Sequence, residues 1–328
     1  MTTLLAPAPD RPWAQLEAAP GETVDGLDDA ALMTTYRAHG AVLLRGFDVD
    51  LPAFGRLVQR LCSGSVFNES PDRQLLDPAA NIQSVNGGAD AFPLHPELSR
   101  EPWKPDLCAF GCLQAPVEGG ETTVCDGVAL AAALPAEVRA GLARERLLYV
   151  QPATPEALRF WLGTETPTDA QLARPPAGCP YRFVRAGARI MRAFTRPALH
   201  RPMFHEGPAF GNFLLFARDY LGRQGFPALS TGKPVPEAWL DAVRAAAEPL
   251  TVPVAWRRGD LLLLDNTRFM HGRRAIADVH GRLIASFFGY LRDALPDPEE
   301  PAAAPWRTGR FIPPHRAAAD GGRSAPDV

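Results

Sequence analysis

Three side chains that commonly bind metal ions occupy two distant points of the sequence. His95 and Glu97 flank a proline in a His-Pro-Glu triplet, and His271 follows far downstream. Two histidines and one carboxylate on one face of an octahedral ion leave positions open for a chelating co-substrate and dioxygen, as iron(II) requires. If the three side chains share an ion, both halves of the chain must pack into one domain. This is the strongest constraint that the sequence places on the fold.

The composition is that of an ordinary globular protein, with 328 residues of which 46% are hydrophobic and 22% charged. A formal charge of −3 gives no bulk attraction to nucleic acid or to an anionic membrane. No apolar run approaches the roughly 20 residues that span a bilayer. Residues 1–20 lack the features of a signal peptide, and the five cysteines lack zinc-site spacing. We therefore expect a cytoplasmic protein with reduced thiols.

Apolar periodicity predicts an α+β fold. The expected helices are Leu27–Ala38, Leu51–Cys62, Val128–Glu145 with Pro135 starting its second part, and Glu237–Glu248. The expected strands are Ala41–Phe47, Leu107–Leu113, Leu261–Asp265 and Arg282–Arg292, with weaker signals at Tyr181–Val184 and Arg189–Phe194. Helices between strands that pair across a long sequence gap indicate a barrel or sandwich core.

The expected organisation is one main domain with two flanking segments. Residues 1–25 form an N-terminal extension, residues 26–293 the domain, and residues 294–328 a tail rich in Pro, Ala and Gly where Trp306 or Phe311 could dock. The polar loop 63–91 and the proline-rich insert 152–210 are expected to act as lids over a substrate. Within them, the polar candidates for substrate contact are Asn86, Arg192, Arg196 and His205.

Local geometry supports the metal hypothesis. Side chains two residues apart on a strand point the same way, so His95 and Glu97 can project together. Pro96 removes a backbone donor, which places this strand at an edge. His271 is expected just past the core strand Leu261–Leu264, at its exit. Taken alone, a His-x-Glu pair is more often a surface feature than a metal site.

Arg282 is a candidate for binding an anion beside the metal ligands. It begins a mostly apolar strand and shares a face with Ile284, Ser286 and Phe288. A guanidinium that faces a core is costly unless an anion pairs with it, and its planar fork matches a carboxylate. If the chain turns back between 277 and 281, Arg282 returns beside His271 and can hold the distal carboxylate of a small diacid. The alternative is an arginine at a strand end that reaches solvent.

These segments together resemble the TauD/TfdA family of iron(II)- and 2-oxoglutarate-dependent dioxygenases, including its clavaminate-synthase-like branch. The matching segments are Gly40–Phe47, Phe92–Glu97, Gly119–Thr122, Asp265–Gly272 and Arg282, and the resemblance covers roughly residues 26–292. It implies a distorted jelly-roll, or double-stranded β-helix, core with flanking helices. It also implies that His95, Glu97 and His271 bind iron. Arg282 would bind the C5 carboxylate of 2-oxoglutarate, and the hydroxyl of Thr122 or of its neighbour Thr123 would help bind the same co-substrate.

Two departures from the family pattern bear on the substrate. Taurine-type relatives carry a second arginine four residues beyond the first, near the substrate anion, where this chain has Ser286. A sulfonate substrate is therefore less expected. Related halogenases have a small residue in place of the carboxylate ligand, and Glu97 fills the room that a halide would need.

The resemblance implies an enzyme that uses Fe(II), 2-oxoglutarate and O2 to oxidise an unactivated C–H bond, with release of succinate and CO2. Hydroxylation is the default outcome, while desaturation, epoxidation and cyclisation would need the same residues. The expected substrate is an amino acid or an amino-acid-derived natural product, free or tethered to a carrier protein. Two rival interpretations are a zinc hydrolase and a non-catalytic β-barrel binding protein. Against the hydrolase, this sequence has no His-Glu-x-x-His motif, and Arg282 would have no role in such an enzyme.

Overall fold

The computed structural model describes residues 2–314, whose strands form three sheets. The largest sheet has the order β1-β2-β3-β15-β8-β17-β4-β18, with β6 pairing with β17 and β5 with β6. Its strands are β1 (Thr3–Leu5), β2 (Ala14–Glu17), β3 (Ala41–Arg45), β4 (Cys62–Val66), β5 (Leu75–Asp77), β6 (Ile82–Ser84), β8 (Leu107–Gln114), β15 (Leu261–Asp265), β17 (Leu283–Leu291) and β18 (Gly309–Phe311).

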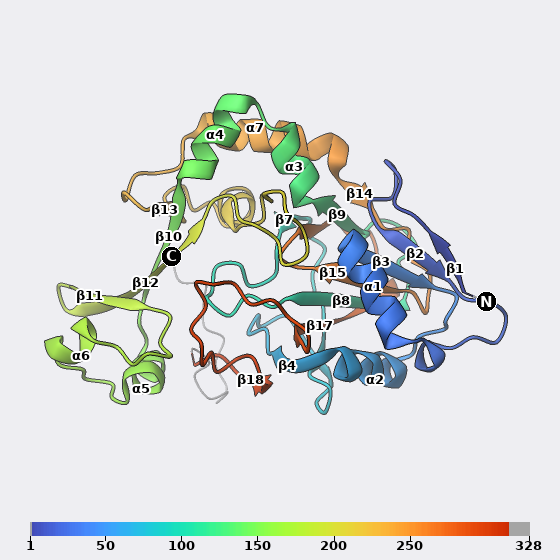
Figure 1. Cartoon of the computed structure of the whole chain (residues 1–328), viewed down its shortest axis with the longest axis horizontal. Coiled ribbons are helices and arrows are strands. Elements are labelled where there is room, and N and C mark those ends of the chain that lie inside the picture. The colour runs from blue at the N-terminus through green and yellow to red at the C-terminus, as the bar shows by residue number, and fades with distance from the viewer. Residues whose placement is uncertain (1, 315–328) are drawn as a thin grey trace.

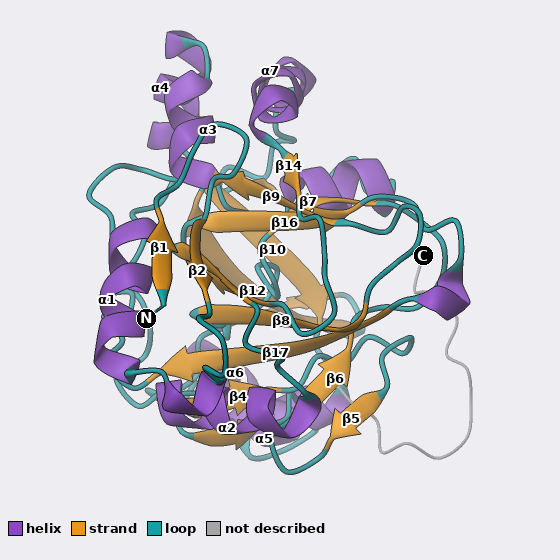
Figure 2. Ribbon diagram, turned by 90° about the vertical axis from the view of Figure 1, so that its right-hand side faces the viewer, coloured by secondary structure: helices purple, strands orange, loops and turns teal. Residues whose placement is uncertain are grey.

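A second sheet faces the first, as Figure 2 shows. Its order is β14-β9-β16-β7, with β14 (Val252–Pro253), β9 (Thr122–Asp126), β16 (Phe269–Arg273) and β7 (Phe92–His95). One apolar cluster joins Phe110 and Phe288 of the large sheet to Val124 and Phe269 of the second sheet. The expected α+β architecture with a two-sheet core is therefore present.

Helices cover the outer faces of this core. They are α1 (Asp29–His39), α2 (Leu51–Leu61), α3 (Gly127–Ala133), α4 (Ala136–Arg144) and α7 (Glu237–Ala247), close to the expected positions. Gly40 ends α1 with φ +73°, and a Cβ there would lie 2.8 Å from the Phe269 ring, so only glycine fits. Pro135 separates α3 from α4, because proline disfavours helical geometry in the residue before it.

The insert 152–210 forms most of a separate layer. The third sheet has the order β11-β12-β10-β13, with β10 (Arg146–Pro152), β11 (Arg182–Ala186), β12 (Arg189–Pro197) and β13 (Ala228–Leu229). Together with α5 (Pro155–Leu162) and α6 (Asp169–Ala173), β11 stands at the lower left of Figure 1. Trp161 and Tyr181 pack against Trp103 at ring distances of 6.3 and 6.2 Å. This part of the insert therefore rests on an aromatic cluster.

Both flanking segments take part in the main sheet. β2 pairs in parallel with β3, and β18 pairs in parallel with β4. Residues 1–25, expected as an extension, thus supply two strands at the edge of the sheet. Trp306 and Phe311 are 1% and 5% exposed, so both dock; the expected tail beyond residue 314 lies outside the described residues. Within residues 2–314, none of the helices is long and apolar enough to cross a membrane.

Candidate metal centre

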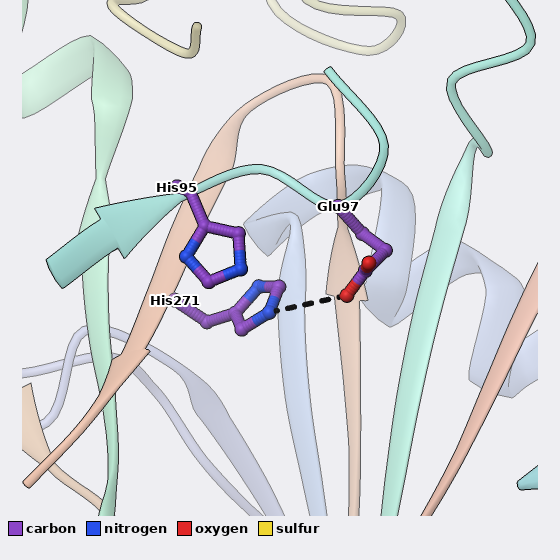
Figure 3. Close-up of side chains that lie close together, drawn as sticks. All are labelled: His95, Glu97 and His271. Atoms are coloured by element: carbon purple, nitrogen blue, oxygen red, sulfur yellow. Dashed lines mark ion pairs between the residues drawn. The ribbon is translucent and has the colours of Figure 1, made fainter. Parts of the chain in front are cut away.

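The three candidate ligands converge. One potential ligand atom from each of His95, Glu97 and His271 lies within 4.8 Å of the others. His271 Nε2 is 3.6 Å from Glu97 Oε2, and the two imidazole rings are 4.6 Å apart. Figure 3 shows the three side chains grouped between a strand end and the neighbouring strand. Among the residues that the structure describes, this is the single group that meets the geometric criteria for a shared ion.

Sheet register positions the two histidines. His95 is the last residue of β7, and it pairs directly with His271 of β16. β7 is an edge strand of its sheet, as expected from Pro96. Glu97, in contrast, lies beyond the strand in a turn where Leu98 has φ +50°. The expectation that His95 and Glu97 share a strand face is therefore wrong; the turn, and not strand alternation, aims the carboxylate.

His271 also differs from its expected place. It does not lie at the exit of the strand Leu261–Leu264 but in the middle of β16, in the opposite sheet. The turn formed by residues 266–268 carries the chain from one sheet to the other. Phe110 from the large sheet contacts His271 at a ring distance of 4.9 Å. The candidate metal centre therefore lies between the sheets, at the end where this crossing occurs.

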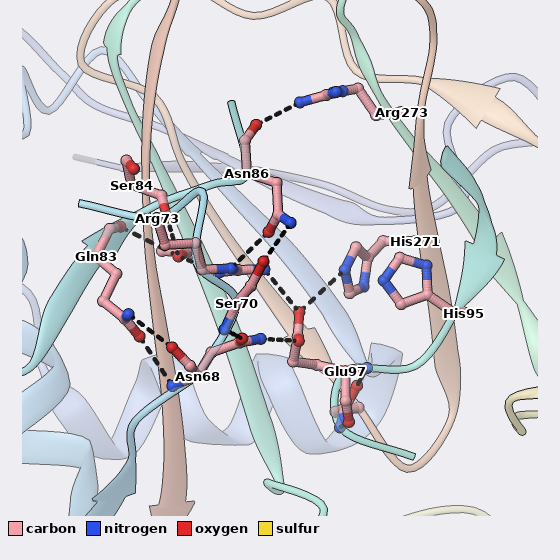
Figure 4. A network of polar contacts seen from close by, with 12 residues as sticks. Asn68, Ser70, Arg73, Gln83, Ser84, Asn86, His95, Glu97, His271 and Arg273 are labelled. Carbon is pink, nitrogen blue, oxygen red and sulfur yellow. Dashed lines mark hydrogen bonds and ion pairs between the residues drawn. The ribbon is translucent and has the colours of Figure 1, made fainter. Parts of the chain in front are cut away.

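Glu97 is 4% exposed and held as a carboxylate. Asn68 Nδ2 donates to Oε1 at 2.6 Å, while Arg73 Nη2 lies 3.5 Å from Oε2, as Figure 4 shows. Burial opposes ionisation, but the charge of Arg73 and then the neighbouring His271 side chain outweigh it and lower the pKa of Glu97 to about 2. Asn266 bonds the Glu97 backbone with both ends of its amide, at 2.8 and 3.1 Å.

The two histidines offer ring nitrogens as ligands. Burial, and then the neighbouring His271, lower the pKa of His95 to about 3. Its Nδ1 lies 2.9 Å from the Pro93 carbonyl, so Nε2 is available as a ligand. His271 Nδ1 is buried without a hydrogen-bond partner among residues 2–314. The set consists of two imidazoles and one ionised carboxylate, with Glu97 and His271 buried and His95 half-buried, and it fits a divalent cation.

Arg282 lies over the Gly-Gly turn that precedes β9. Its Nε donates to the Gly120 carbonyl at 2.8 Å, and a Cβ at Gly120 would lie 3.0 Å from Arg282 Cδ. Burial, and then the nearby Arg273, lower the pKa of Arg282 to about 10. No carboxylate lies at ion-pair distance from this guanidinium within the described part of the chain. Arg282 is thus partly buried with its terminal nitrogens available to an anion.

Thr122 and Thr123 point to opposite faces of β9. Thr122 pairs with Arg273, two residues from His271 on the same strand, so its side chain shares the face of His271. Thr123 pairs with Gly272 and points away from that face. Thr122 Oγ1 accepts a 3.1 Å hydrogen bond from Trp256 Nε1, which leaves its hydroxyl hydrogen free to donate.

The profile described as "Taurine catabolism dioxygenase TauD, TfdA family" matches residues 8–286 of this chain. The match contains the three converging side chains and Arg282. The chain belongs to the TauD/TfdA family. This membership confirms the enzyme class expected from the sequence, an Fe(II)- and 2-oxoglutarate-dependent dioxygenase, and it removes the zinc hydrolase from consideration.

Solved structures share the fold of this TauD/TfdA member. PvcB from Pseudomonas aeruginosa has 18% identity and a TM-score of 0.59, over 91% of this chain and 94% of PvcB. A taurine dioxygenase from Burkholderia xenovorans has 14% identity and a TM-score of 0.58, over 91% and 92%. AAD-2 in complex with Mn(II) and N-oxalylglycine has 12% identity and a TM-score of 0.55, over 90% and 100%. A search of curated proteins found no match.

The polar candidates from the two lid segments have different outcomes. Asn86 lies at the site, where its Oδ1 accepts from Arg73 Nε at 2.7 Å and its backbone carbonyl accepts from Arg273 at 2.6 Å. Arg192 lies near Tyr181 and Gln151 in the insert. Arg196 donates to the carbonyls of residues 101 and 102, and His205 Nδ1 accepts from the Gly207 backbone. Asn86 is therefore the candidate that the structure brings to the metal centre.

Sequence reasoning missed four residues of this site: Asn68, Arg73, Asn266 and Arg273. Asn266 had a usable signal, because it lies inside the segment that carries His271. Arg273 is buried and donates to the backbone carbonyls of residues 86, 88 and 90, which ties the polar loop to β16. Asn68 and Arg73 come from that loop, where no periodic pattern marks individual residues.

A separate cavity of about 1040 Å³ lies between the third sheet and the segment 295–307. Its lining includes Lys104, Arg196 and His200 but none of the three candidate ligands. The cavity therefore is not the space around the metal centre.

Proposed function

We propose that this protein is a 2-oxoglutarate-dependent hydroxylase of a small molecule, with iron(II) held by His95, Glu97 and His271. The observation that carries the proposal is the convergence of these three side chains within 4.8 Å, between two sheets and from distant parts of the chain. When bound, iron(II), 2-oxoglutarate and O2 together supply the oxidising chemistry, with succinate and CO2 as co-products.

Arg282 and Thr122 are proposed to bind the far carboxylate of 2-oxoglutarate. Arg282 offers terminal N–H groups that have no carboxylate partner within residues 2–314, and Thr122 offers a hydroxyl hydrogen on the face of His271. Two donors of this kind match one carboxylate. Thr123 points to the other face, so we do not propose it for this role.

The remaining residues orient and enclose the site. Asn68 and Asn266 fix the carboxylate and backbone of Glu97. Phe216 packs on the His95 ring at 4.6 Å, and Phe110 packs on His271 at 4.9 Å. Aromatic walls on both imidazoles keep water away from the ligand nitrogens, and a dry site strengthens the charge interactions within it.

We further infer that the two facing sheets are a distorted jelly roll, and that the loop 63–91 and the insert 152–210 cover the substrate. The match to solved TauD-like structures supports the first inference. Three residues of the loop, Asn68, Arg73 and Asn86, reach the metal centre, which supports a lid role for that segment. The insert ends next to the site, because a Cβ at Gly211, the residue directly after it, would lie 3.7 Å from Pro96 Cγ.

The proposed substrate is an amino acid or an amino-acid-derived natural product. Ser286 occupies the place of the second arginine of taurine-type relatives, which disfavours a sulfonate. A structural relative, PvcB, is described as an Fe, alpha-ketoglutarate dependent oxygenase from an isonitrile synthetic pathway, at 19% identity and a TM-score of 0.59 over 91% of this chain and 98% of PvcB. The same residues would serve a desaturase or cyclase, and product mass distinguishes these, since hydroxylation adds one oxygen.

The proposal is tested by titrating the protein with iron(II) and then 2-oxoglutarate without oxygen. We expect a weak visible absorption band that requires both additions, and succinate after air is admitted. The His271→Ala variant should lose the band and the succinate. His205→Ala, which removes a histidine that contacts Gly207 instead of the metal centre, should keep both. No band and no succinate from the wild-type protein would overturn the proposal.

A further inference from the structure

Arg73 borders the metal position. Its side chain is 7% exposed, and its Nη2 lies 3.5 Å from Glu97 Oε2. The same oxygen faces His271 Nε2 at 3.6 Å, whereas Oε1 is turned toward Asn68. Oε2 is therefore the oxygen on the side of His271, and the Arg73 guanidinium lies beside the same oxygen (Figure 4).

The guanidinium is held in one orientation. Arg73 Nε donates to Asn86 Oδ1 at 2.7 Å, and Nη1 donates to Ser286 Oγ at 3.0 Å. The guanidinium carbon lies 5.0 Å from the centre of the Phe288 ring. Because three neighbours fix the group before any ligand arrives, little side-chain entropy is lost when it binds one.

Hydrogen-bonding capacity remains after these contacts. A guanidinium carries five N–H donors, and the contacts with Asn86, Ser286 and Glu97 use one donor on each nitrogen. One N–H on each terminal nitrogen is left without a partner among residues 2–314. Two adjacent donors of this kind match the two oxygens of a carboxylate.

The charge of Arg73 also lacks a dedicated partner. Glu97 is the one carboxylate at ion-pair distance from Arg73 within the described residues. If Glu97 binds a metal ion, much of its charge is shared with that ion. A buried guanidinium would then be left undercompensated, which is costly unless another anion approaches.

We propose that Arg73 binds a carboxylate of the primary substrate, so that the substrate is a small free carboxylic acid. This inference rests on the proposed function and narrows it. A substrate tethered to a carrier protein through its carboxyl group is an uncharged thioester, which would leave Arg73 without its anion. The guanidinium beside Ser286 thus supplies, from a different segment, the anion contact that Ser286 itself cannot make.

The test is calorimetric binding to the protein loaded with Mn(II) and N-oxalylglycine, an unreactive analogue of 2-oxoglutarate. The probes are the common L-amino acids and their N-acetyl derivatives, each paired with its primary amide. We expect at least one acid to bind saturably and about 10-fold or more tightly than its amide, the loss typical of a charge-assisted hydrogen bond. Arg73→Gln should reduce this preference to about 2-fold. Arg258→Gln, at an exposed position outside both lid segments, should keep it.

Four results would overturn the inference: no acid binds, acid and amide bind equally, the preference survives in Arg73→Gln, or that variant loses only N-oxalylglycine affinity. The last result would assign Arg73 to the co-substrate. If Arg73→Gln does not fold, Arg73→Lys is measured instead, since it keeps the charge but lacks the paired N–H groups of the guanidinium. Unchanged acid affinity in Arg73→Lys would also overturn the inference. Failure of the wild-type protein to bind Mn(II) with N-oxalylglycine would instead contradict the proposed function.

Discussion

Asn266 holds the backbone of Glu97 with both ends of its side-chain amide. Its Oδ1 accepts from Glu97 N–H at 2.8 Å, and its Nδ2 donates to Glu97 C=O at 3.1 Å and to Pro105 C=O at 2.8 Å. Asn266 lies in the turn that leads into β16, the strand of His271. One side chain thus fixes the relative positions of the carboxylate ligand and the distant histidine.

Replacing Asn266 with alanine is expected to weaken metal binding by about 10- to 100-fold, as is usual for groups that orient metal ligands. The variant should also lose about 1–3 kcal/mol of stability, because buried backbone groups at Glu97 lose their partners. A chelator competition assay measures the first effect and urea denaturation the second.

Asn212→Ala is the matched control for this variant. Asn212 is also buried and also bridges backbone groups, accepting from Leu214 N–H and donating to Ala198 C=O, both at 3.0 Å. It should lose comparable stability and keep wild-type metal affinity. Equal losses of metal affinity in the two variants would mean that Asn266 has no particular role in positioning Glu97.

The two threonines of β9 give a sharp comparison. Thr122→Val removes a hydroxyl on the face of His271 and should weaken 2-oxoglutarate binding by about 10-fold or more, the usual cost of a hydrogen bond to a charged group. Thr123→Val changes the opposite face and should leave that affinity within about 2-fold of wild type. The height of the anaerobic absorption band against 2-oxoglutarate concentration measures both. The reverse order of effects would contradict the assignment of Thr122.

Gly120 is expected to tolerate no side chain. Its φ of +70° favours glycine, and a Cβ would lie 2.9 Å from Ile276 Cγ1 and 3.0 Å from Arg282 Cδ. Gly120→Ala should therefore displace Arg282 and weaken 2-oxoglutarate binding, with iron affinity retained. Gly232→Ala is the control, because Gly232 has φ +82° but nothing within 4 Å of a new Cβ. Both should lose stability from backbone strain, and Gly120→Ala alone should lose co-substrate affinity.

The buried Lys104 is expected to make the stability of the folded protein depend on pH. Burial, and then the nearby Arg196, lower the pKa of Lys104 to about 7, and its Nζ has one long contact, 3.4 Å from the Gly211 carbonyl. Since the folded-state pKa lies below the ordinary value of 10.5, the charged form destabilises the fold most at and below pH 7. Lys104→Met should therefore gain about 1–3 kcal/mol near pH 7, and the gain should shrink toward pH 10.

Urea denaturation of wild type and Lys104→Met at pH 7 and pH 9.5 measures this gain as a difference, in which other titrating groups cancel. Lys233→Met, at an exposed position, is the control and should show no pH-dependent difference. A gain for Lys104→Met that is the same at both pH values would show that the charge of Lys104 is not the cause.

The sequence singled out the three side chains that converge because few residue types bind iron, and His95, Glu97 and His271 are such types at unusual positions. It could not place them correctly. Glu97 looks like a strand residue two positions after His95, but the positive φ of Leu98 is not visible from alternation. His271 follows a four-leucine strand, yet the short turn after Asp265 moves the chain to the other sheet.

The polar surroundings of the site were not predictable for a different reason. Asn68 and Arg73 lie in an irregular polar loop, where local sequence does not determine which side chains turn inward. Their roles depend on contacts with distant partners, Glu97 for Asn68 and Ser286 for Arg73. The insert 152–210 shows the same limit, since its strand signals were visible but its packing against Trp103 was not.

The most direct test of this account is the iron(II) affinity and stoichiometry of the wild-type protein beside His95→Ala, Glu97→Ala and His271→Ala. We predict one iron per chain in the wild type and a loss of about 100-fold or more in affinity for each variant, because each removes a coordinating side chain from a set of three. Iron binding by all three variants at wild-type affinity would show that these residues do not form the metal centre.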